Sequence, residues 1–308
     1  MMNNPFVSVI IPNYNHARFL DERIHSVLNQ TYQQFEMIIL DDKSSDNSLE
    51  VITKYKDYPQ ISHIVANEEN GGSTFKQWQK GLELAKGDLV WIAESDDSCS
   101  ITMLETLVKG CVNNDAVLAF CRSCKYDVQG NKSIYAHQSV LLHDIVMQGT
   151  EFISKYMIEI NVVANASSAI FNRTAAMSVD KQYMTMRGEG DWLFWIELME
   201  TGKVFFCSDA LNYFRFHGSN TTNIQVIKGI SAIEHKTTFD YLVQHGYLEG
   251  IPQKIEKLRL LNCWLGMNFE NKKIKRDVLN VWDRNRLGRL YLLCSHIKEG
   301  FKLIASLV

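Results

Sequence analysis

The stretch Trp91–Asp97 reads WIAESDD and places three carboxylates, Glu94, Asp96 and Asp97, directly after an apolar run. Like charges this close repel one another, and burying them costs free energy unless a positive group lies between them. A solvated turn would tolerate such a cluster without further partners. A hard divalent cation would instead hold the carboxylates together, because Mg²⁺ and Mn²⁺ prefer oxygen ligands. The stretch therefore indicates either a surface turn or a metal site.

A second acidic segment follows an earlier apolar run. Asp41, Asp42 and Asp46 come directly after Phe35–Leu40, which reads FEMIIL. Magnesium-type ions are usually held by one or two carboxylates together with substrate phosphates. The sequence contains neither a G-x-x-x-x-G-K-[ST] loop nor a G-x-G-x-x-G motif to bind phosphate through the backbone. The acids therefore predict a phosphorylated substrate, most simply a diphosphate, whose charge is neutralised by metal and side chains.

The first 125 residues alternate between apolar runs and amphipathic segments, and this alternation decides where the acids lie. Strands are expected at 6–11, 35–40, 61–66, 88–93 and 116–121, and helices at 17–30, 48–55, 73–85 and 101–110. Continuous apolar strands that alternate with helices predict a mostly parallel sheet covered on both faces. In such sheets ligands bind beyond the carboxyl ends of the strands. The polar segments after the first, second and fourth strands should therefore meet at one edge.

The rest of the chain is less regular. Residues 126–150 read as a loop or hairpin region, and from about residue 224 the pattern is helical. Further helices are expected at 150–160 and 191–201, and strands at 167–171, 204–207 and 213–217. The sequence therefore predicts a regular half at 1–125, a less regular half at 126–223 and a helical region at 224–308.

Composition excludes several classes of protein. The net charge of −3 gives no overall attraction to nucleic acid. The sequence has no run of 18 apolar residues, so no membrane span is predicted. No basic segment precedes an apolar one at the N-terminus, so no signal peptide is expected. Cys121 and Cys124 form a single CxxC without a second Cys/His pair, which favours reduced thiols over a zinc site. These features predict a cytoplasmic protein.

Four segments, taken together and in order, resemble a family 2 inverting glycosyltransferase of the GT-A fold. They are VSVIIPNYN (Val7–Asn15), DDKSSDNS (Asp41–Ser48), the block from Asn70 to Asp97, and GEGDWLFWIELMETG (Gly188–Gly202) with YFRFHGSNTT (Tyr213–Thr222) after it. The resemblance implies an α/β fold with a Rossmann-like, mostly parallel sheet flanked by helices and a helical C-terminal extension at 224–308. Residues 1–223 would form the transferase domain, with a donor-binding half at 1–125 and an acceptor half at 126–223.

The resemblance also implies roles in binding a nucleotide-sugar donor, most simply a UDP-sugar. Pro12 and Tyr14 would lie against the base and ribose, and Asp42 would accept a hydrogen bond from the base. Lys76 or Gln77 would reach the base or the phosphates, although this segment departs from the family's commoner A-R-N form.

The metal and the catalytic base follow from the same resemblance. Glu94-Ser95-Asp96-Asp97 occupies the position of the family's D-x-D-D motif and would hold Mn²⁺ or Mg²⁺. Asp97 is the expected metal ligand, Asp96 would meet metal or ribose, and Glu94 departs from the commoner Asp. A ligand role at metal or diphosphate is also expected for His217.

The acceptor side is predicted around the helix at 191–201. Asp191 matches the family's catalytic base, although by itself it would also suit the start of a helix. Glu189 would face the acceptor, which is expected to be a glycan or a lipid-linked sugar. Trp192 is the best candidate for stacking on the acceptor, and core packing is its alternative.

The mechanism implied is one displacement. A carboxylate takes the proton of the acceptor hydroxyl, and the metal neutralises the departing nucleoside diphosphate. Attack from the face opposite the leaving group inverts the anomeric centre. The resemblance implies bacterial surface polysaccharide synthesis as the setting. Two rivals remain: a degenerate glycosyltransferase that acts as a scaffold or glycan-binding subunit, and a sugar-phosphate nucleotidylyltransferase, whose Gly-rich N-terminal loop is replaced here by PNYN.

A basic amphipathic stretch lies near the C-terminus. Residues 271–302 contain nine Lys and Arg against three Asp and Glu, interleaved with apolar residues such as Trp282 and Phe301. This composition fits a helix on an anionic membrane, and it equally fits a helix that packs on the domain or on another subunit. Peripheral contact with the inner face of the cell membrane and homo-oligomerisation both stay open.

Overall fold

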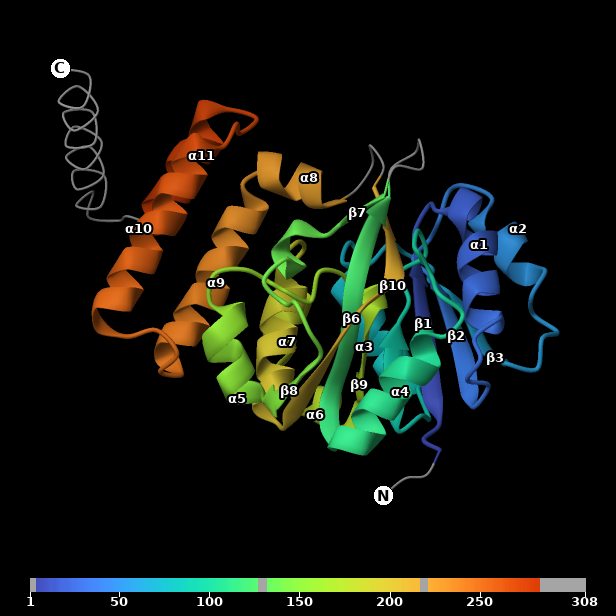
Figure 1. The fold of residues 1–308 in the computed structure, drawn as a ribbon. Coiled ribbons are helices and arrows are strands. Elements are labelled where there is room, and N and C mark those ends of the chain that lie inside the picture. Colours follow the sequence, from blue (N-terminus) through green and yellow to red (C-terminus); the bar gives the residue numbers. More distant parts are fainter. Residues whose placement is uncertain (1–3, 127–131, 217–220, 283–308) are drawn as a thin grey trace, which may run out of the picture. The chain divides into compact units, whose positions relative to one another are not determined.

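A computed structural model describes residues 4–126, 132–216 and 221–282 (Figure 1). The chain divides into two compact units, residues 1–219 and 220–308, where the sequence predicts a division after residue 223. The first unit contains the sheet and all the acidic segments.

One mixed sheet forms the centre of the first unit, in the order β3-β2-β1-β4-β9-β6-β10-β5. The strands are β1 (Val7–Asn13), β2 (Phe35–Asp41), β3 (Ile61–Ala66), β4 (Leu89–Ile92), β5 (Ser98–Cys99), β6 (Ala116–Tyr126), β7 (Lys132–Ile134), β8 (Ile145–Gln148), β9 (Ala169–Asn172) and β10 (Lys203–Arg215). β3, β2, β1 and β4 run parallel, as do β6 and β10, while β9 lies antiparallel between β4 and β6. The predicted α/β class with a mostly parallel sheet is confirmed.

Helices cover both faces of this sheet because its central strands are apolar on both sides. α1 (Ala17–Leu28), α2 (Ser48–Thr53) and α4 (Met103–Asn114) share one buried cluster with alternate residues of β1. α3 (Thr74–Leu84) packs against Ile10 on the other face. Gly81 permits this approach, since a Cβ at Gly81 would lie 2.4 Å from Ile10 Cγ2.

The less regular half contains more strand than the sequence predicts. β10 runs unbroken through 13 residues where two separate strands were expected, because it pairs with β6 on one side and with β8 and β5 on the other. The region 126–150 contains β7 and β8. The helix expected at 150–160 is shorter, with α5 (Gly149–Phe152) continuing as a π-helical turn at Ile153–Met157. α6 (Arg173–Ser178) and α7 (Gly190–Glu200) complete the helices of this unit.

The CxxC pair lies in strand β6 rather than in a metal-binding loop. Cys121 is buried and Cys124 is partly buried, and neither is in a disulfide. Successive side chains of a strand point to opposite faces, so residues three apart do not converge on one ion. The favoured interpretation as reduced thiols agrees with this geometry.

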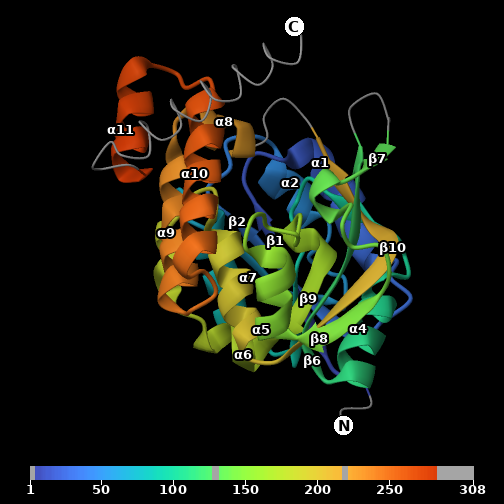
Figure 2. The same ribbon diagram turned by 60° about the vertical axis from the view of Figure 1, so that its left-hand side comes forward.

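The second unit consists of helices. They are α8 (Thr221–Ile227), α9 (Ile230–Gln244), α10 (Gly250–Gly266) and α11 (Lys272–Trp282), of which α9, α10 and α11 lie side by side (Figure 2). Trp282 is fully buried, donates from Nε1 to the carbonyl of Ala232 at 2.8 Å, and packs against His235 and Phe239.

The basic stretch 271–302 therefore falls partly within α11, where its apolar face packs on α9. Residues 283–302 of that stretch lie outside the described residues. No helix in the described ranges is long and apolar enough to cross a membrane.

His235 makes the second unit sensitive to acid. Its ring lies between Trp264 and Trp282, and burial, aided by the charge of Arg259, lowers its pKa to about 3. The unfolded chain therefore binds a proton that the folded chain excludes, so stability falls as the pH drops from about 6.5 towards 3.

We expect the melting temperature of the wild type to fall more between pH 7.5 and pH 4.5 than that of His235→Gln, followed by circular dichroism. The Gln variant serves as its own control for lost packing at pH 7.5, where both chains are uncharged at this position. Equal losses in the two proteins would contradict the assignment.

Candidate active site

The carboxyl ends of β1, β2 and β4 bring the predicted polar segments together at one edge of the sheet. Asn13 Nδ2 donates to Asp41 Oδ2 at 2.8 Å, which joins the ends of β1 and β2. His16 Nδ1 lies 2.9 Å from Ser95 Oγ, which joins the start of α1 to the acidic turn after β4. The expected convergence at this edge is therefore present in the structure.

Asp42 is held rigidly at the end of β2. It is 5% exposed, and its Oδ1 accepts hydrogen bonds from Asn67 Nδ2, the Gly71 N–H and Gln77 Nε2 at 2.6, 2.9 and 2.9 Å. Of the other residues predicted here, Pro12 is buried within β1 and Tyr14 is 49% exposed. The structure thus fixes the carboxylate of Asp42 and leaves the ring of Tyr14 exposed.

A hollow of about 460 Å³ adjoins Gly71. Its lining includes three cations, Lys76, Lys181 and Arg187, and the side chains of Met184 and Met186. The lining comes from two segments, 71–76 and 181–187. They are joined directly, because Ser73 Oγ donates to the carbonyl of Met186 at 3.0 Å. Positive charge therefore lines a concave surface beside the Asp42 carboxylate.

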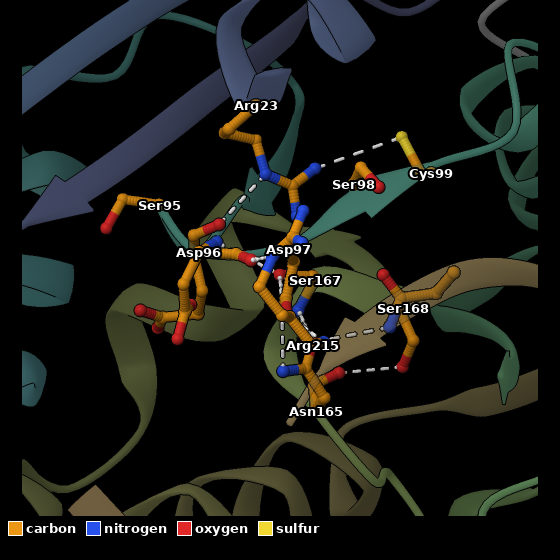
Figure 3. A network of polar contacts seen from close by, with 12 residues as sticks. Arg23, Ser95, Asp96, Asp97, Ser98, Cys99, Asn165, Ser167, Ser168 and Arg215 are labelled. Atoms are coloured by element: carbon orange, nitrogen blue, oxygen red, sulfur yellow. Dashed lines mark hydrogen bonds and ion pairs between the residues drawn. The ribbon is translucent and has the colours of Figure 1, made fainter. Parts of the chain in front are cut away.

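Asp97 is the centre of a buried hydrogen-bond network (Figure 3). It is 1% exposed. Its Oδ2 accepts from Ser167 Oγ at 2.7 Å and Asn165 Nδ2 at 2.8 Å, and its Oδ1 accepts from the N–H of Arg215 at 3.0 Å. Burial, together with the charge of Asp96, raises the pKa of Asp97 to about 7, although Arg23, the Ser167 hydroxyl and the N–H of Arg215 act to lower it. Both oxygens of Asp97 are thus occupied by protein donors.

Arg23 supplies the positive charge beneath this turn. It is fully buried in α1, its Nε donates to the carbonyl of Glu94 at 2.8 Å, and its Nη2 lies 4.0 Å from Asp97 Oδ2. No motif in the sequence singles out this residue. Its signal is an arginine on the buried side of an amphipathic helix, where Leu20, Ile24 and Val27 are its buried neighbours.

Glu94 and Asp96 occupy different surroundings from Asp97. Glu94 is partly buried, and its Oε1 accepts from Trp78 Nε1 at 2.9 Å. Burial, with a further contribution from Asp96, raises the pKa of Glu94 to about 8. Asp96 is partly exposed, and its main-chain carbonyl accepts from Arg215 Nε at 2.9 Å.

A divalent cation at this turn would draw on few protein ligands. In the described part of the chain, no group of three or more His, Cys, Asp or Glu is arranged to hold a metal ion. His217, predicted to join the ligands, lies outside the described residues. Of the three acids, Glu94 and Asp96 are each partly exposed, whereas Asp97 is 1% exposed. Such a donor set fits an ion held by one or two carboxylates plus substrate phosphates.

Asp191 lies in the first turn of α7. Its Oδ2 accepts from Asn161 Nδ2 at 3.0 Å and its Oδ1 from the N–H of Trp192 at 2.9 Å. Glu189 is the N-cap residue of this helix, a place that the sequence analysis had considered for Asp191. Burial, together with the charges of Asp191 and Glu189, raises the pKa of Tyr135.

The segment 161–167 connects the two acidic centres. Asn161 holds Asp191 at one end, and Asn165 and Ser167 hold Asp97 at the other. Asn161 and Asn165 are four residues apart, which limits their separation to about 14 Å of extended chain. Sequence reasoning gave no role to this segment, because its polar side chains have no motif or spacing of their own.

Trp192 belongs to the core. It is 2% exposed and donates from Nε1 to the carbonyl of Met157 at 3.1 Å. The expected contact with an acceptor is therefore corrected to the packing alternative, since a ring with so little exposed surface cannot stack on a sugar.

Comparison with known proteins gives a consistent result. The family described as Glycosyl transferase family 2 matches residues 8–181 of this chain. TarP of Staphylococcus aureus (strain N315), a poly(ribitol-phosphate) beta-N-acetylglucosaminyltransferase, is 27% identical over 308 residues, which cover 91% of this chain and 86% of that protein. Across the relatives, the aligned part covers between 28% and 86% of the relative's own length.

Two solved structures share the fold. TarS 1–349 of S. aureus in complex with UDP has a TM-score of 0.65 at 16% identity, over 90% of this chain and 80% of that one. The mannosyltransferase PcManGT from Pyrobaculum calidifontis, in complex with GDP-Man and Mn²⁺, has a TM-score of 0.60 at 15% identity, over 97% and 81%. These likenesses confirm the predicted GT-A type fold.

The separate surroundings of Asp97 and Asp96 predict different effects on stability. Asp97→Ala leaves the Arg23 guanidinium buried without its counter-ion, which should cost roughly 3–5 kcal/mol. Asp96→Ala is the matched control in the next position and should cost about 1 kcal/mol or less. The measurement is urea unfolding followed by tryptophan fluorescence. Similar midpoints for the two variants would show that Asp97 is not the anchor of the turn.

Proposed function

This chain belongs to the family 2 glycosyltransferases, and we propose that it moves a sugar from a nucleoside diphosphate donor, a UDP-sugar, to a hydroxyl of a glycan or lipid-linked acceptor with inversion. The observation that carries this proposal is the segment 161–167, which ties the base candidate Asp191 to the turn that ends β4. Because one short segment holds both the base and the donor site, both can act on the same anomeric carbon. The setting we propose is bacterial surface polysaccharide synthesis, in line with the name of TarP.

The donor nucleotide would occupy the edge between β1 and β2. Asp42, fixed by three donors to its Oδ1, would accept from the base, and the exposed ring of Tyr14 would cover it. The cationic hollow that contains Lys76 adjoins this carboxylate and would attract the diphosphate. That TarS binds UDP supports a uridine nucleotide.

A divalent cation, Mn²⁺ or Mg²⁺, would neutralise the charge of the leaving diphosphate. Asp96 would hold it together with the phosphates, since Asp96 is partly exposed whereas Asp97 is 1% exposed. The presence of Mn²⁺ with GDP-Man in PcManGT supports this requirement.

Asp191 would act as the general base. Asn161 and the N–H of Trp192 orient its carboxylate, whose remaining lone pairs can take the proton of an acceptor hydroxyl as the new bond forms. The bond from the anomeric carbon to the diphosphate oxygen breaks on the opposite face. Glu189 and Tyr135 would border the acceptor.

The two rival functions are separable by assay. A degenerate scaffold would bind UDP without dependence on Mn²⁺, or not at all. A nucleotidylyltransferase would make the nucleotide sugar from UTP and a sugar 1-phosphate. A panel of UDP-sugars, assayed for release of UDP with and without an acceptor, therefore tests the proposed function against both.

We expect Asp191→Asn to lower the transfer rate by about 10²- to 10⁴-fold, because the amide cannot take the acceptor's proton. UDP binding measured by calorimetry should stay close to that of the wild type. Asp209→Asn, a similar change at an exposed position of β10, is the control and should transfer normally. Normal turnover by Asp191→Asn would exclude this residue as the base.

Loss of the carboxylate at position 96 should affect metal-dependent binding. We expect Asp96→Asn to weaken UDP binding in the presence of Mn²⁺ by tenfold or more and to leave the weaker binding in EDTA unchanged. Calorimetry in both conditions measures this difference. An equal loss in EDTA would assign Asp96 to the nucleotide and not to the metal.

A further inference from the structure

Trp78 contacts Glu94 through its indole N–H and the helix α7 through its ring. Its Nε1 donates to Glu94 Oε1 at 2.9 Å. Its ring packs against Phe194 and Trp195 of α7, with centroids 5.8 and 5.9 Å away. Trp78 is 2% exposed, so both contacts are enclosed.

The two partners of Trp78, Glu94 and α7, lie beside the proposed metal ligand and the proposed base. Glu94 opens the turn that contains Asp96, and α7 begins at Gly190, next to Asp191. We propose that Trp78 is a positioning residue and that its hydrogen bond to Glu94 fixes the acidic turn against the helix that carries the base. This inference rests on the proposed function. Such a link matters because a shift of about 1 Å between reacting groups can cost a factor of about 100 in rate.

The link explains why position 94 carries Glu. Trp78 lies in the segment that departs from the family's commoner A-R-N form, and Glu94 is the departure from D-x-D-D. The structure brings these two departures into contact. An Asp at this position is shorter by one carbon–carbon bond, about 1.5 Å, and would not reach the indole N–H from the same backbone. Glu94 is thus a partner of Trp78 in place of a metal ligand.

Two substitutions of Glu94 separate these roles. Glu94→Gln keeps the length and an oxygen that accepts from Trp78, but replaces the carboxyl group with an amide. Glu94→Asp keeps the carboxyl group but is too short to reach Trp78. The link predicts that Glu94→Asp lowers the turnover number of transfer at least tenfold, while Glu94→Gln stays within a few-fold of the wild type. A metal ligand predicts the reverse order, which would overturn the inference.

Trp78→Phe tests the other end of the link. It keeps most of the packing against α7 and removes only the N–H, so it should match Glu94→Asp, and the double variant should be no worse than either single one. Trp195→Phe is the matched control in the same aromatic cluster, since Trp195 Nε1 has no hydrogen-bond partner among the described residues. Equal effects of the two Trp→Phe changes would show that Trp78 acts through packing alone.

Three measurements keep the result independent of folding and of the proposed function. Urea midpoints of the two Trp→Phe variants should be similar, while the turnover number falls for Trp78→Phe alone and the affinity for UDP changes little. The indole N–H resonance of Trp78, assigned by its loss in Trp78→Phe, should move in Glu94→Asp and stay in place in Glu94→Gln. If the wild type transfers no sugar, the proposed function fails. If it transfers but the resonance does not respond, the link fails.

Discussion

The guanidinium of Arg23, enclosed beneath an acidic turn, is the charge on which the active edge depends. Three carboxylates within four residues would repel one another after a buried strand, and a cation that cannot reach water offsets this repulsion. Arg23 contacts the carbonyl of Glu94 and approaches Asp97, so one residue of α1 orients both ends of the turn. Because α1 packs on the sheet through its apolar residues, that charge is fixed in place by the core.

The fixed turn in turn organises the second half of the unit. Asp97 accepts from Asn165, Ser167 and the N–H of Arg215. These donors come from the segment before β9 and from the end of β10, two places far apart in the chain. Burying a carboxylate without such partners would destabilise the fold by several kcal/mol. The fold is therefore most stable when the segment before β9 and the end of β10 both bind to Asp97. The part of the unit after residue 126 is therefore attached to residues 4–125 through a charge and its donors as well as through packing.

The sequence predicts the repetitive features well and the unique contacts poorly. Continuous apolar runs such as Phe35–Leu40 predict buried strands. The sheet, its helices and the sheet edge at which the acids meet could therefore be predicted. Asn161 and Ser167 were not, since a polar side chain in an irregular segment has no period that could reveal its partner. For Trp192 the sequence left two interpretations open, contact with the acceptor and packing in the core, and its 2% exposure decides for the core.

The three acids of the WIAESDD stretch therefore differ in role because their surroundings differ, although all three are carboxylates. Asp97 has both oxygens taken by donors and stabilises the turn. Glu94 is one carbon longer and reaches across to Trp78 on α3. Asp96 stays partly exposed at the sheet edge, where a carboxylate can meet an ion and a diphosphate. The three acids thus have unequal surroundings, since Asp97 is buried among protein donors and Glu94 accepts from Trp78, and Asp96 is the acid that we propose as the metal ligand.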